Sequence, residues 1–389
     1  MFCPICRNTD VDLFSEIDNY PAIIWPVQED DLKTIRHKRI RTFLCSECGH
    51  IYQDENNSDF TKYIYENLYK YYTHENVEAM NETYQKGFEE VFKALEFPVN
   101  AEVLEIGTSS ANQMKIYLDN NMNCTAINPG AKAHEKITFI DGYYGEKQIN
   151  KKFDLIVARL LLEHIYDLSN IVNEIKFNLK ENGVVIIQVP NTLEMIKDRV
   201  LNFLAHEHFH YFNHFSLIKL FKDMKYKLIR TNSLKDPSII AVFQYQNTLN
   251  KPKEEFNNFL NIKNEIDNYR SNCDRIVDDV RKLAHKKKII FYGAGLSLTA
   301  LLYKAQSSIQ DVENCEFVDD NPLYVGKYFP MTRYIVSDPQ KIELTDDTCV
   351  ILICRGIYHE RILKRIKKLN WNTQIYTIGT NGIERMAIE

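Results

Sequence analysis

Four of the eleven histidines, His206, His208, His210 and His214, lie within nine residues, and Glu207 stands between the first two. Adjacent imidazole and carboxylate groups suit proton abstraction near neutral pH, because small changes of environment bring a histidine pKa to the working pH of a base. The spacing is not His-Glu-x-x-His, so it excludes the zinc-protease helix. Two alternatives stay open: a metal site that uses His210 and His214, one helical turn apart, and a structural role for all four histidines.

Two Cys-x-x-Cys pairs, Cys3 with Cys6 and Cys45 with Cys48, form the most specific local pattern of the chain. Four thiolates on two tight turns can hold one tetrahedral Zn²⁺. The alternatives are a redox dithiol and chance pairing, but neither flank resembles the thioredoxin-like unit in which a redox pair opens a helix. We therefore predict a structural zinc ion that closes a module too small to fold firmly alone, with His50 beside the ligands.

Short apolar runs alternate with helical segments between about residue 100 and residue 190, which is typical of a parallel sheet covered by helices on both faces. Strands are predicted at 102–106, 124–127, 136–140, 153–158 and 183–189. An amphipathic helix is expected over 75–97, and an antiparallel hairpin over 226–230 and 239–244 would close the sheet. The fifth strand would deliver its loop, with the histidine cluster beyond it, to the carboxyl edge of the sheet.

The turn after the first of these strands combines an acid, Glu105, with one glycine, Gly107, ahead of an expected helix start. A glycine lets the backbone approach a ligand closely, and the free amides of a helix start favour a nucleotide-like ligand. Only one glycine of the usual two or three is present, so an ordinary strand-to-helix turn is the alternative.

This turn, the segment 153–165 and the run Leu179-Lys180-Glu181-Asn182-Gly183-Val184 together resemble the class I S-adenosylmethionine-dependent methyltransferases. The resemblance implies a doubly wound α/β sheet and S-adenosylmethionine as cofactor. Cofactor contacts are implied at Glu105, Gly107, Ser109, Asn128, Asp141, Ala158, Arg159 and His164. Asn128 departs from the family, which ends its second strand with an acid, and an asparagine lacks the charge-assisted strength of a carboxylate toward ribose hydroxyls.

In order along nearly the whole chain, the pieces resemble the sugar C-methyltransferases that act on nucleotide-linked 4-keto-deoxyhexoses. Catalytic roles are implied for His208 as the base and for Glu207, His206 and Tyr72. Substrate contacts are implied at Tyr71, Asn191, Tyr211, Gly293 and Gly295. Ala205 stands where the family often has a tyrosine, and 235–238 replaces a glycine-rich segment. We therefore expect a reshaped sugar pocket.

A second αβ alternation runs from Lys288 to Ile378 and carries Gly293-Ala294-Gly295 after its first strand. A dinucleotide-binding oxidoreductase is the alternative for this turn, but it would leave the His-Glu-His loop unused. Residues 250–285 have a helical period and predict a connecting helix pair. The expected parts are a zinc-binding module (1–74), a methyltransferase core (75–248), a helical connector (249–285) and a Rossmann-like domain (286–389).

The composition is that of a globular chain, with 44% hydrophobic residues and only 13 glycines and 11 prolines in 389 residues. A formal net charge of −5 argues against nucleic acid and anionic membranes as partners. An odd number of cysteines, no run of 18 apolar residues and no apolar segment after Met1 predict a protein of the reducing cytoplasm. The sequence indicates no oligomeric state.

The function expected from these features is methyl transfer from S-adenosylmethionine to a nucleotide-linked keto sugar. C-methylation through an enolate, formed by a histidine base, is the favoured chemistry. The alternatives are O- or N-methylation of a sugar, and a nucleotide-sugar-binding subunit without methyltransferase activity.

Overall fold

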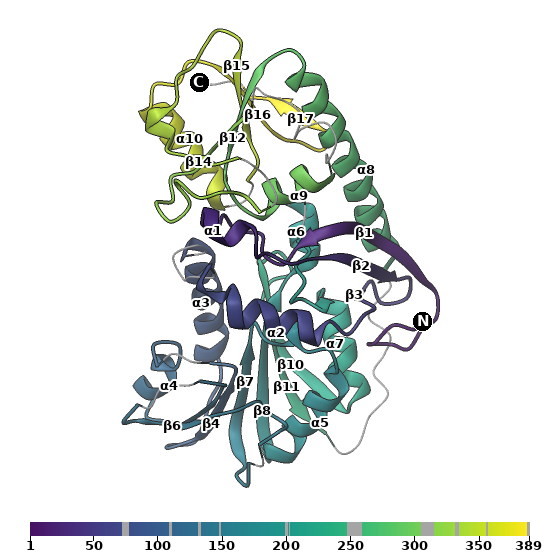
Figure 1. The fold of residues 1–389 in the computed structure, drawn as a ribbon. Helices are drawn as coiled ribbons and strands as arrows, with labels where there is room; N and C mark the ends of the chain where they lie inside the picture. Colours follow the sequence, from purple (N-terminus) through teal and green to yellow (C-terminus); the bar gives the residue numbers. More distant parts are fainter. Residues whose placement is uncertain are drawn as a thin grey trace.

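The computed structural model describes residues 1–71, 78–108, 111–130, 134–147, 149–198, 201, 203–246, 259–304, 315–330, 334–354 and 357–386. It contains sheets of four, seven and six strands. In Figure 1 the small N-terminal sheet lies between the two larger ones, with the seven-stranded sheet below it and the six-stranded sheet above. The N-terminal segment is therefore placed to contact both other parts of the chain.

The seven-stranded sheet has the order β10-β11-β8-β7-β4-β5-β6. Its strands are β10 (Tyr226–Thr231), β11 (Ser238–Tyr245), β8 (Leu179–Pro190), β7 (Phe153–Arg159), β4 (Glu102–Ile106), β5 (Asn123–Ile127) and β6 (Ile137–Ile140). The strands from β8 to β6 are parallel, and β11 is antiparallel to both of its neighbours. This order confirms the doubly wound class I methyltransferase sheet and its closing hairpin.

Successive residues of the central strands face two separate apolar cores. In β4, Val103 packs into one core and Leu104 into the other, and both are fully buried. The sheet is covered by α3 (Glu78–Lys93) and α4 (Lys115–Asp119) on one face and by α5 (Leu168–Asn178) and α7 (His214–Asp223) on the other. Since alternate side chains point to opposite faces, continuous apolar runs are what a sheet covered on both sides requires.

A four-stranded antiparallel sheet, β1-β2-β3-β9, forms the centre of the N-terminal module. Its elements are β1 (Val11–Pro21), β2 (His37–Cys45), β3 (Ile51–Gln53) and β9 (His210–Tyr211), with α1 (Glu29–Leu32), α2 (Ser58–Asn67) and the 3₁₀ helix η1 (Tyr69–Tyr71) beside them. β9 belongs to the histidine-rich segment that follows β8. The module and this segment therefore share one sheet.

The C-terminal sheet has the order β14-β13-β12-β15-β16-β17 and is parallel except for β17. Its elements are β12 (Lys288–Tyr292), β13 (Cys315–Val318), β14 (Val336–Ser337), β15 (Thr348–Leu352), β16 (Gln374–Ile378), β17 (Ile383–Arg385), α9 (Leu296–Lys304), α10 (Ile357–Lys368) and the 3₁₀ helix η4 (Pro339–Lys341). The parallel strands with their intervening helices form the second αβ unit that the sequence indicates.

One helix, α8 (Phe259–Ala284), precedes this sheet where a helix pair was expected. The described part of the connector is thus a single helix, and residues 247–258, where the other helix of the pair was expected, lie outside the described residues. No glycine or proline interrupts α8, so nothing in its sequence ends this helix before residue 284. α8 lies along one side of the C-terminal sheet in Figure 1 and contacts the short helix α6 (Thr192–Lys197) of the methyltransferase part.

Specific contacts join the N-terminal module to the C-terminal sheet. The Thr299 hydroxyl donates to the Ile24 carbonyl at 2.8 Å, and the Trp25 and Tyr324 rings stack with centroids 5.9 Å apart. Val27 and Tyr328 exchange backbone hydrogen bonds of 2.8 Å. The module thus connects the two larger sheets.

Candidate active site

Gly107 directly follows β4 at the carboxyl edge of the seven-stranded sheet. Its φ of +86° is a conformation that side chains rarely adopt, and its N–H donates to the Ile127 carbonyl at 2.9 Å. A Cβ at this position would lie 3.1 Å from Cδ1 of Leu161. The glycine is therefore required by the fold at this turn.

The two charged residues expected at the cofactor, Glu105 and Arg159, bind each other. Arg159 Nε and one terminal nitrogen lie 2.8 Å and 2.7 Å from Glu105 Oε1, and both side chains are buried. Gln113 also donates to Oε1 at 2.8 Å, and the Arg159 guanidinium lies 4.3 Å from the Phe88 ring centroid. Burial raises the pKa of Glu105, and the neighbouring Arg159 opposes that rise. Glu105 and Arg159 therefore form an internal ion pair at the floor of the site, and their charges neutralise each other.

The loop after β5 is closed by short polar contacts. Asn128 donates from Nδ2 to the Pro129 carbonyl at 3.0 Å, and Asp141 accepts the Gly130 N–H at 2.8 Å. Both residues follow the carboxyl ends of their strands, Asn128 after β5 next to β4 and Asp141 after β6 one strand further out. Ala158, in β7, is fully buried, and Ser109 lies outside the described residues. The glycine turn and the Asn128 and Asp141 oxygens fit an adenosine-bearing cofactor at this edge.

A cluster of Glu163, His164 and His208 adjoins this edge. Glu163 and His164 belong to the 3₁₀ helix η3 (Leu162–His164), which follows β7, while His208 comes from the segment before β9. One polar atom of each residue lies within 4.8 Å of the others, and the imidazole centroids are 4.6 Å apart in an edge-to-face contact. The Phe209 N–H donates to the Glu163 carbonyl at 2.7 Å, which ties the two segments together.

The environment of this cluster keeps its three groups uncharged near neutral pH. Burial raises the pKa of Glu163 to about 8 and lowers the pKa of His164 to about 4. Desolvation also lowers the pKa of His208, and the neighbouring His164 lowers it further. A neutral imidazole can accept a proton, so His208 has the protonation state that a base needs.

Gln53 of β3 holds the backbone of the segment that carries His208. Its Nε2 lies 3.0, 3.3 and 2.6 Å from the carbonyl oxygens of Ala205, His206 and His208. Its backbone N–H donates to the Phe209 carbonyl at 2.9 Å. The N-terminal module thereby fixes the loop on which the candidate base stands.

Two further contacts close the same segment. The Tyr211 hydroxyl accepts the Ala205 N–H and donates to the Ala205 carbonyl, both at 3.1 Å. His50 and His210 are buried, and their rings are joined by a 3.0 Å hydrogen bond between Nε2 and Nδ1. Tyr211, expected at the substrate, therefore uses its hydroxyl to shape the loop.

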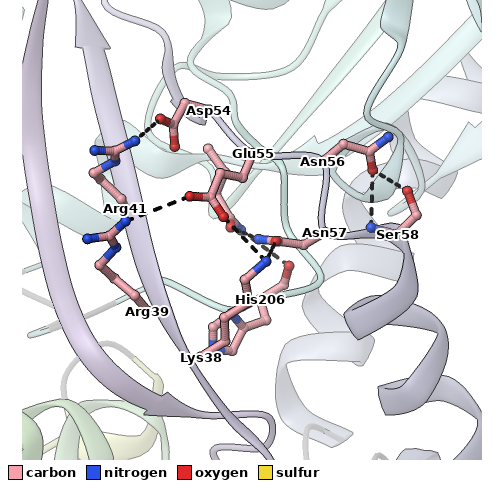
Figure 2. Close-up of polar contacts among 10 residues, drawn as sticks. Lys38, Arg39, Arg41, Asp54, Glu55, Asn56, Asn57, Ser58 and His206 are labelled. Atoms are coloured by element: carbon pink, nitrogen blue, oxygen red, sulfur yellow. Dashed lines mark hydrogen bonds and ion pairs between the residues drawn. The ribbon is translucent and has the colours of Figure 1, made fainter.

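The side chain of His206 is directed toward the N-terminal module. Its Nε2 lies 3.1 Å from the Tyr20 carbonyl, and its ring packs edge-on against Phe60 at 4.7 Å. Figure 2 shows it near Lys38 of β2, beside the Asp54–Ser58 turn and its ion pairs. Glu207 is buried, and its carbonyl oxygen lies 3.0 Å from Nδ1 of His164. Of the His-Glu-His side chains, the structure thus brings His208 into the cluster.

The residues expected at the substrate lie in several places. Tyr71 is buried, and its hydroxyl donates to Asp31 and accepts the Gln28 N–H. Asn191 is buried and donates to the Leu234 and Asp236 carbonyls at 3.1 Å and 2.9 Å, so it anchors the β10–β11 loop. Tyr72 lies outside the described residues.

The Gly293-Ala294-Gly295 turn follows β12. Gly293 has a φ of +110°, and the Ala294 N–H donates to Asp319 at 2.7 Å. A Cβ on Gly295 would lie 3.7 Å from the Trp25 ring. Asp319 thus accepts the hydrogen bond of one backbone amide of this turn, and Trp25 of the N-terminal module packs against the turn.

The four cysteines of the two pairs converge at one point. Their sulfur atoms lie within 4.8 Å of one another, with Cys3–Cys48 at 3.7 Å and Cys6–Cys45 at 3.4 Å. Four ligands at about 2.3 Å from a tetrahedral Zn²⁺ would lie about 3.8 Å apart, so the donor set fits the ion. Contacts with the Cys3 and Cys45 sulfurs and burial raise the pKa of Cys48, an effect that a bound dication would oppose.

Three residues of the site were not singled out by sequence reasoning: Glu163, Tyr65 and Gln53. Glu163 directly precedes His164, which was the one available signal. The Tyr65 hydroxyl lies 3.2 Å from Nδ1 of His164, and it reaches the cluster from α2. Neither Tyr65 nor Gln53 stands in a motif.

Comparisons with known proteins bear on the central part of the chain. Residues 77–231 match a family model described as a methyltransferase domain. These residues form a methyltransferase domain. The chain is also 25% identical over 202 residues to the C-methyltransferase NovU of Streptomyces niveus, a match that covers 48% of each protein. It therefore spans about half the length of this curated relative.

Solved structures with a similar fold include the glycopeptide N-methyltransferase MtfA in complex with S-adenosylmethionine, at 9% identity and a TM-score of 0.33 over 42% of this chain and 94% of that chain. The mitomycin 7-O-methyltransferase MmcR is 14% identical, with a TM-score of 0.40 over 48% of this chain and 60% of that chain. Among the described residues, no helix is both long and apolar enough to span a bilayer.

Proposed function

We propose that this protein transfers a methyl group from S-adenosylmethionine to a carbon of a nucleotide-linked keto sugar, with His208 as the base. The methyltransferase domain and the similarity to a C-methyltransferase support the reaction class. The observation that carries the proposal is the neutral His208 within the cluster at the cofactor edge of the sheet. The nucleotide-linked sugar comes from the family that the chain resembles.

The chain's own residues would form and hold the carbon nucleophile. A ketone acidifies the neighbouring C–H bond, and His208 would take that proton while the electron pair moves toward the carbonyl oxygen. Gln53 and Tyr211 would keep the His208 backbone in place during this step. Gly107, Asn128 and Asp141 would hold S-adenosylmethionine, whose sulfonium group supplies an already activated methyl group.

We also propose that Cys3, Cys6, Cys45 and Cys48 bind one structural Zn²⁺. The spacing of their sulfurs supports a tetrahedral thiolate site. The cluster packs in the same apolar core as Phe212 and Phe221 of the methyltransferase part. A metal at this position would stabilise the junction between the module and the domain.

One observation favours a second candidate, a nucleotide-sugar-binding subunit without methyltransferase activity. The acid of the first strand, Glu105, is paired with Arg159, and Asn128 stands where the family has a carboxylate. The edge therefore offers a cofactor less negative charge than the family pattern. Cofactor binding separates the two candidates.

Titration calorimetry with S-adenosylmethionine on zinc-loaded protein is the first test, and the absence of binding would exclude the methyltransferase function. The second test follows loss of deuterium from the carbon next to the ketone of a nucleotide-linked 4-keto-6-deoxyhexose. His208→Ala should abolish this loss because it removes the proposed base, whereas His285→Ala, at an exposed site, should leave it unchanged. Persistent exchange in His208→Ala would remove His208 from the role of base.

A further inference from the structure

Glu163 carries a buried carboxyl oxygen that the described residues leave unpaired. Its side chain is 2% exposed, and its Oε2 has no hydrogen-bond partner among the described residues. A buried polar atom without a partner costs roughly 1–3 kcal/mol, so an unpaired carboxyl oxygen in a methyltransferase domain requires a reason.

The polar atoms of the three groups converge closely enough to contact one shared oxygen atom. Because their polar atoms lie within 4.8 Å of one another, a point exists that is no more than about 2.8 Å from all three. This is the ordinary length of an O–H···O or O–H···N hydrogen bond. His164 and His208 are half-buried, so the cluster is not fully enclosed by protein.

The hydrogen-bonding capacity of the cluster identifies the kind of oxygen. A carbonyl oxygen can only accept, so the 3.0 Å contact with the Glu207 carbonyl places the proton of neutral His164 on Nδ1. Nε2 of His164 is then an acceptor. Glu163 keeps its proton near neutral pH, since burial raises its pKa to about 8, and it is therefore a donor. One donor and one acceptor match a hydroxyl group, whereas a ketone oxygen would face the lone pair of His164.

We propose that Glu163 and His164 bind a hydroxyl group of the sugar next to its reacting carbon, with Glu163 donating to the hydroxyl oxygen and the hydroxyl donating to Nε2 of His164. This assignment rests on the proposed function for the sugar itself. It makes Glu163 a specificity-determining residue. A site built to bond a hydroxyl discriminates strongly against a substrate that lacks it, because the buried groups are then left unpaired.

The titratable groups that face Glu163 do not compete with it in the relevant pH range. His164 and His208 are already neutral, because burial lowers the pKa of each. Tyr65 from α2 and Tyr84 from α3 face Glu163, and burial raises the pKa of both. Ionisation of Glu163 is therefore the event expected to weaken sugar binding above pH 8.

Calorimetric binding of thymidine diphosphate-4-keto-6-deoxyglucose without S-adenosylmethionine tests the proposal apart from catalysis. We expect the wild-type Kd to rise about tenfold between pH 7 and pH 9. The pKa of Glu163 is about 8, so at pH 9 only about a tenth of the protein keeps the protonated Glu163. Glu163→Gln keeps a donor that cannot ionise, so its Kd should stay nearly constant over this range. Glu163→Leu should bind at least tenfold more weakly at pH 7, and Glu181→Gln, at an exposed site, should behave as the wild type.

The outcomes distinguish this proposal from the function on which it rests. Wild-type protein that binds no nucleotide-linked keto sugar would contradict the proposed function. Wild-type binding that Glu163→Leu leaves unchanged would contradict the role of Glu163 alone. A second metal ion per chain, besides the zinc, that is lost in Glu163→Gln would also overturn it, because the cluster would then be a metal site.

Thermal unfolding provides a measurement that needs no ligand. The unfolded chain ionises Glu163 above about pH 4.5, while the folded chain keeps the proton up to about pH 8, so ionisation favours unfolding in this window. The melting temperature of Glu163→Gln relative to wild type should therefore rise between pH 6 and pH 8.5. A difference that stays constant over that range would overturn the assignment of a protonated Glu163.

Discussion

At the scale of single residues, the structure turns two expected ligand contacts into an internal ion pair. Glu105 and Arg159 lie at the ends of β4 and β7, and both side chains are almost completely buried. The interaction between two such charges offsets the cost of removing them from water only while both are present. The pair therefore supports the floor of the site. Its loss should mainly lower the free energy of unfolding of the protein.

Arg159→Met should destabilise the protein by about 3–5 kcal/mol, because it leaves the Glu105 carboxylate buried without its partner. The double variant Glu105→Leu with Arg159→Met should recover much of that loss. Lys115→Met is the matched control, since its partner Asp119 is exposed and such pairs contribute about 0–1 kcal/mol. Urea unfolding measures all three. A double variant as unstable as Arg159→Met would show that lost packing, and not the unpaired charge, is responsible.

At the scale of elements, the segment that bears the candidate base is a part of the N-terminal sheet. β9 pairs with β3, Gln53 bonds the loop carbonyls, and the four cysteines pack in the core beneath. The amino-terminal module and the loop after β8 are therefore one structural unit, although they are far apart in the sequence. A structural change at the cysteine cluster should therefore also change the loop that carries His208, because β3 connects the two.

Loss of the metal should loosen this unit. We expect one zinc ion per chain by elemental analysis, loss of that ion in Cys6→Ser, and faster amide exchange over residues 205–211 in the variant, because β9 loses a firm partner strand. Cys354→Ser, outside the cluster, should retain the metal and the wild-type exchange. Protein that is folded, metal-free and unchanged by a chelator would contradict the zinc site.

At the scale of the whole molecule, the buried histidines make stability depend strongly on pH. Burial, complete or partial, lowers the pKa of seven histidines: His37, His50, His164, His206, His208, His210 and His214. Their folded pKa values lie below those of the unfolded chain, so the unfolded state binds more protons once the pH falls below about 6.5. The stability that these neutral histidines contribute is fully present above that pH and is lost as the pH falls toward 4.

We expect the melting temperature to drop steeply from pH 7 to pH 5. Each such histidine lowers the free energy of unfolding by up to about 1.4 kcal/mol per pH unit in this range. His206→Gln should make the drop shallower because it removes one of these groups, while His285→Gln, at an exposed site, should leave the slope unchanged. Circular dichroism at a series of pH values measures it. A melting temperature that is constant between pH 7 and pH 5 would contradict the neutral, buried state of the cluster.

Local sequence patterns predicted the seven-stranded sheet well, because its strands are continuous apolar runs with helices between them. They failed for β1, whose eleven residues mix exposed charges with apolar positions and contain irregular pairing at Leu13 and Ile17. They also missed α2. Both elements gain their stability from contacts with distant segments, such as Phe14 with Phe203 and Phe60 with His206, and a local pattern does not contain those contacts.

The sequence by itself predicted the methyltransferase sheet and the two Cys-x-x-Cys pairs, because each strand and each pair is a pattern of residues that are close together in the chain. The tertiary structure decided the rest. It directed His206 away from the cluster, paired Glu105 with Arg159, and brought Glu163 and His164 to His208 across more than forty residues. Chemistry at this site requires side chains to meet within a few ångströms, and only the contact of η3 with β9, which β3 holds in its sheet, brings them that close.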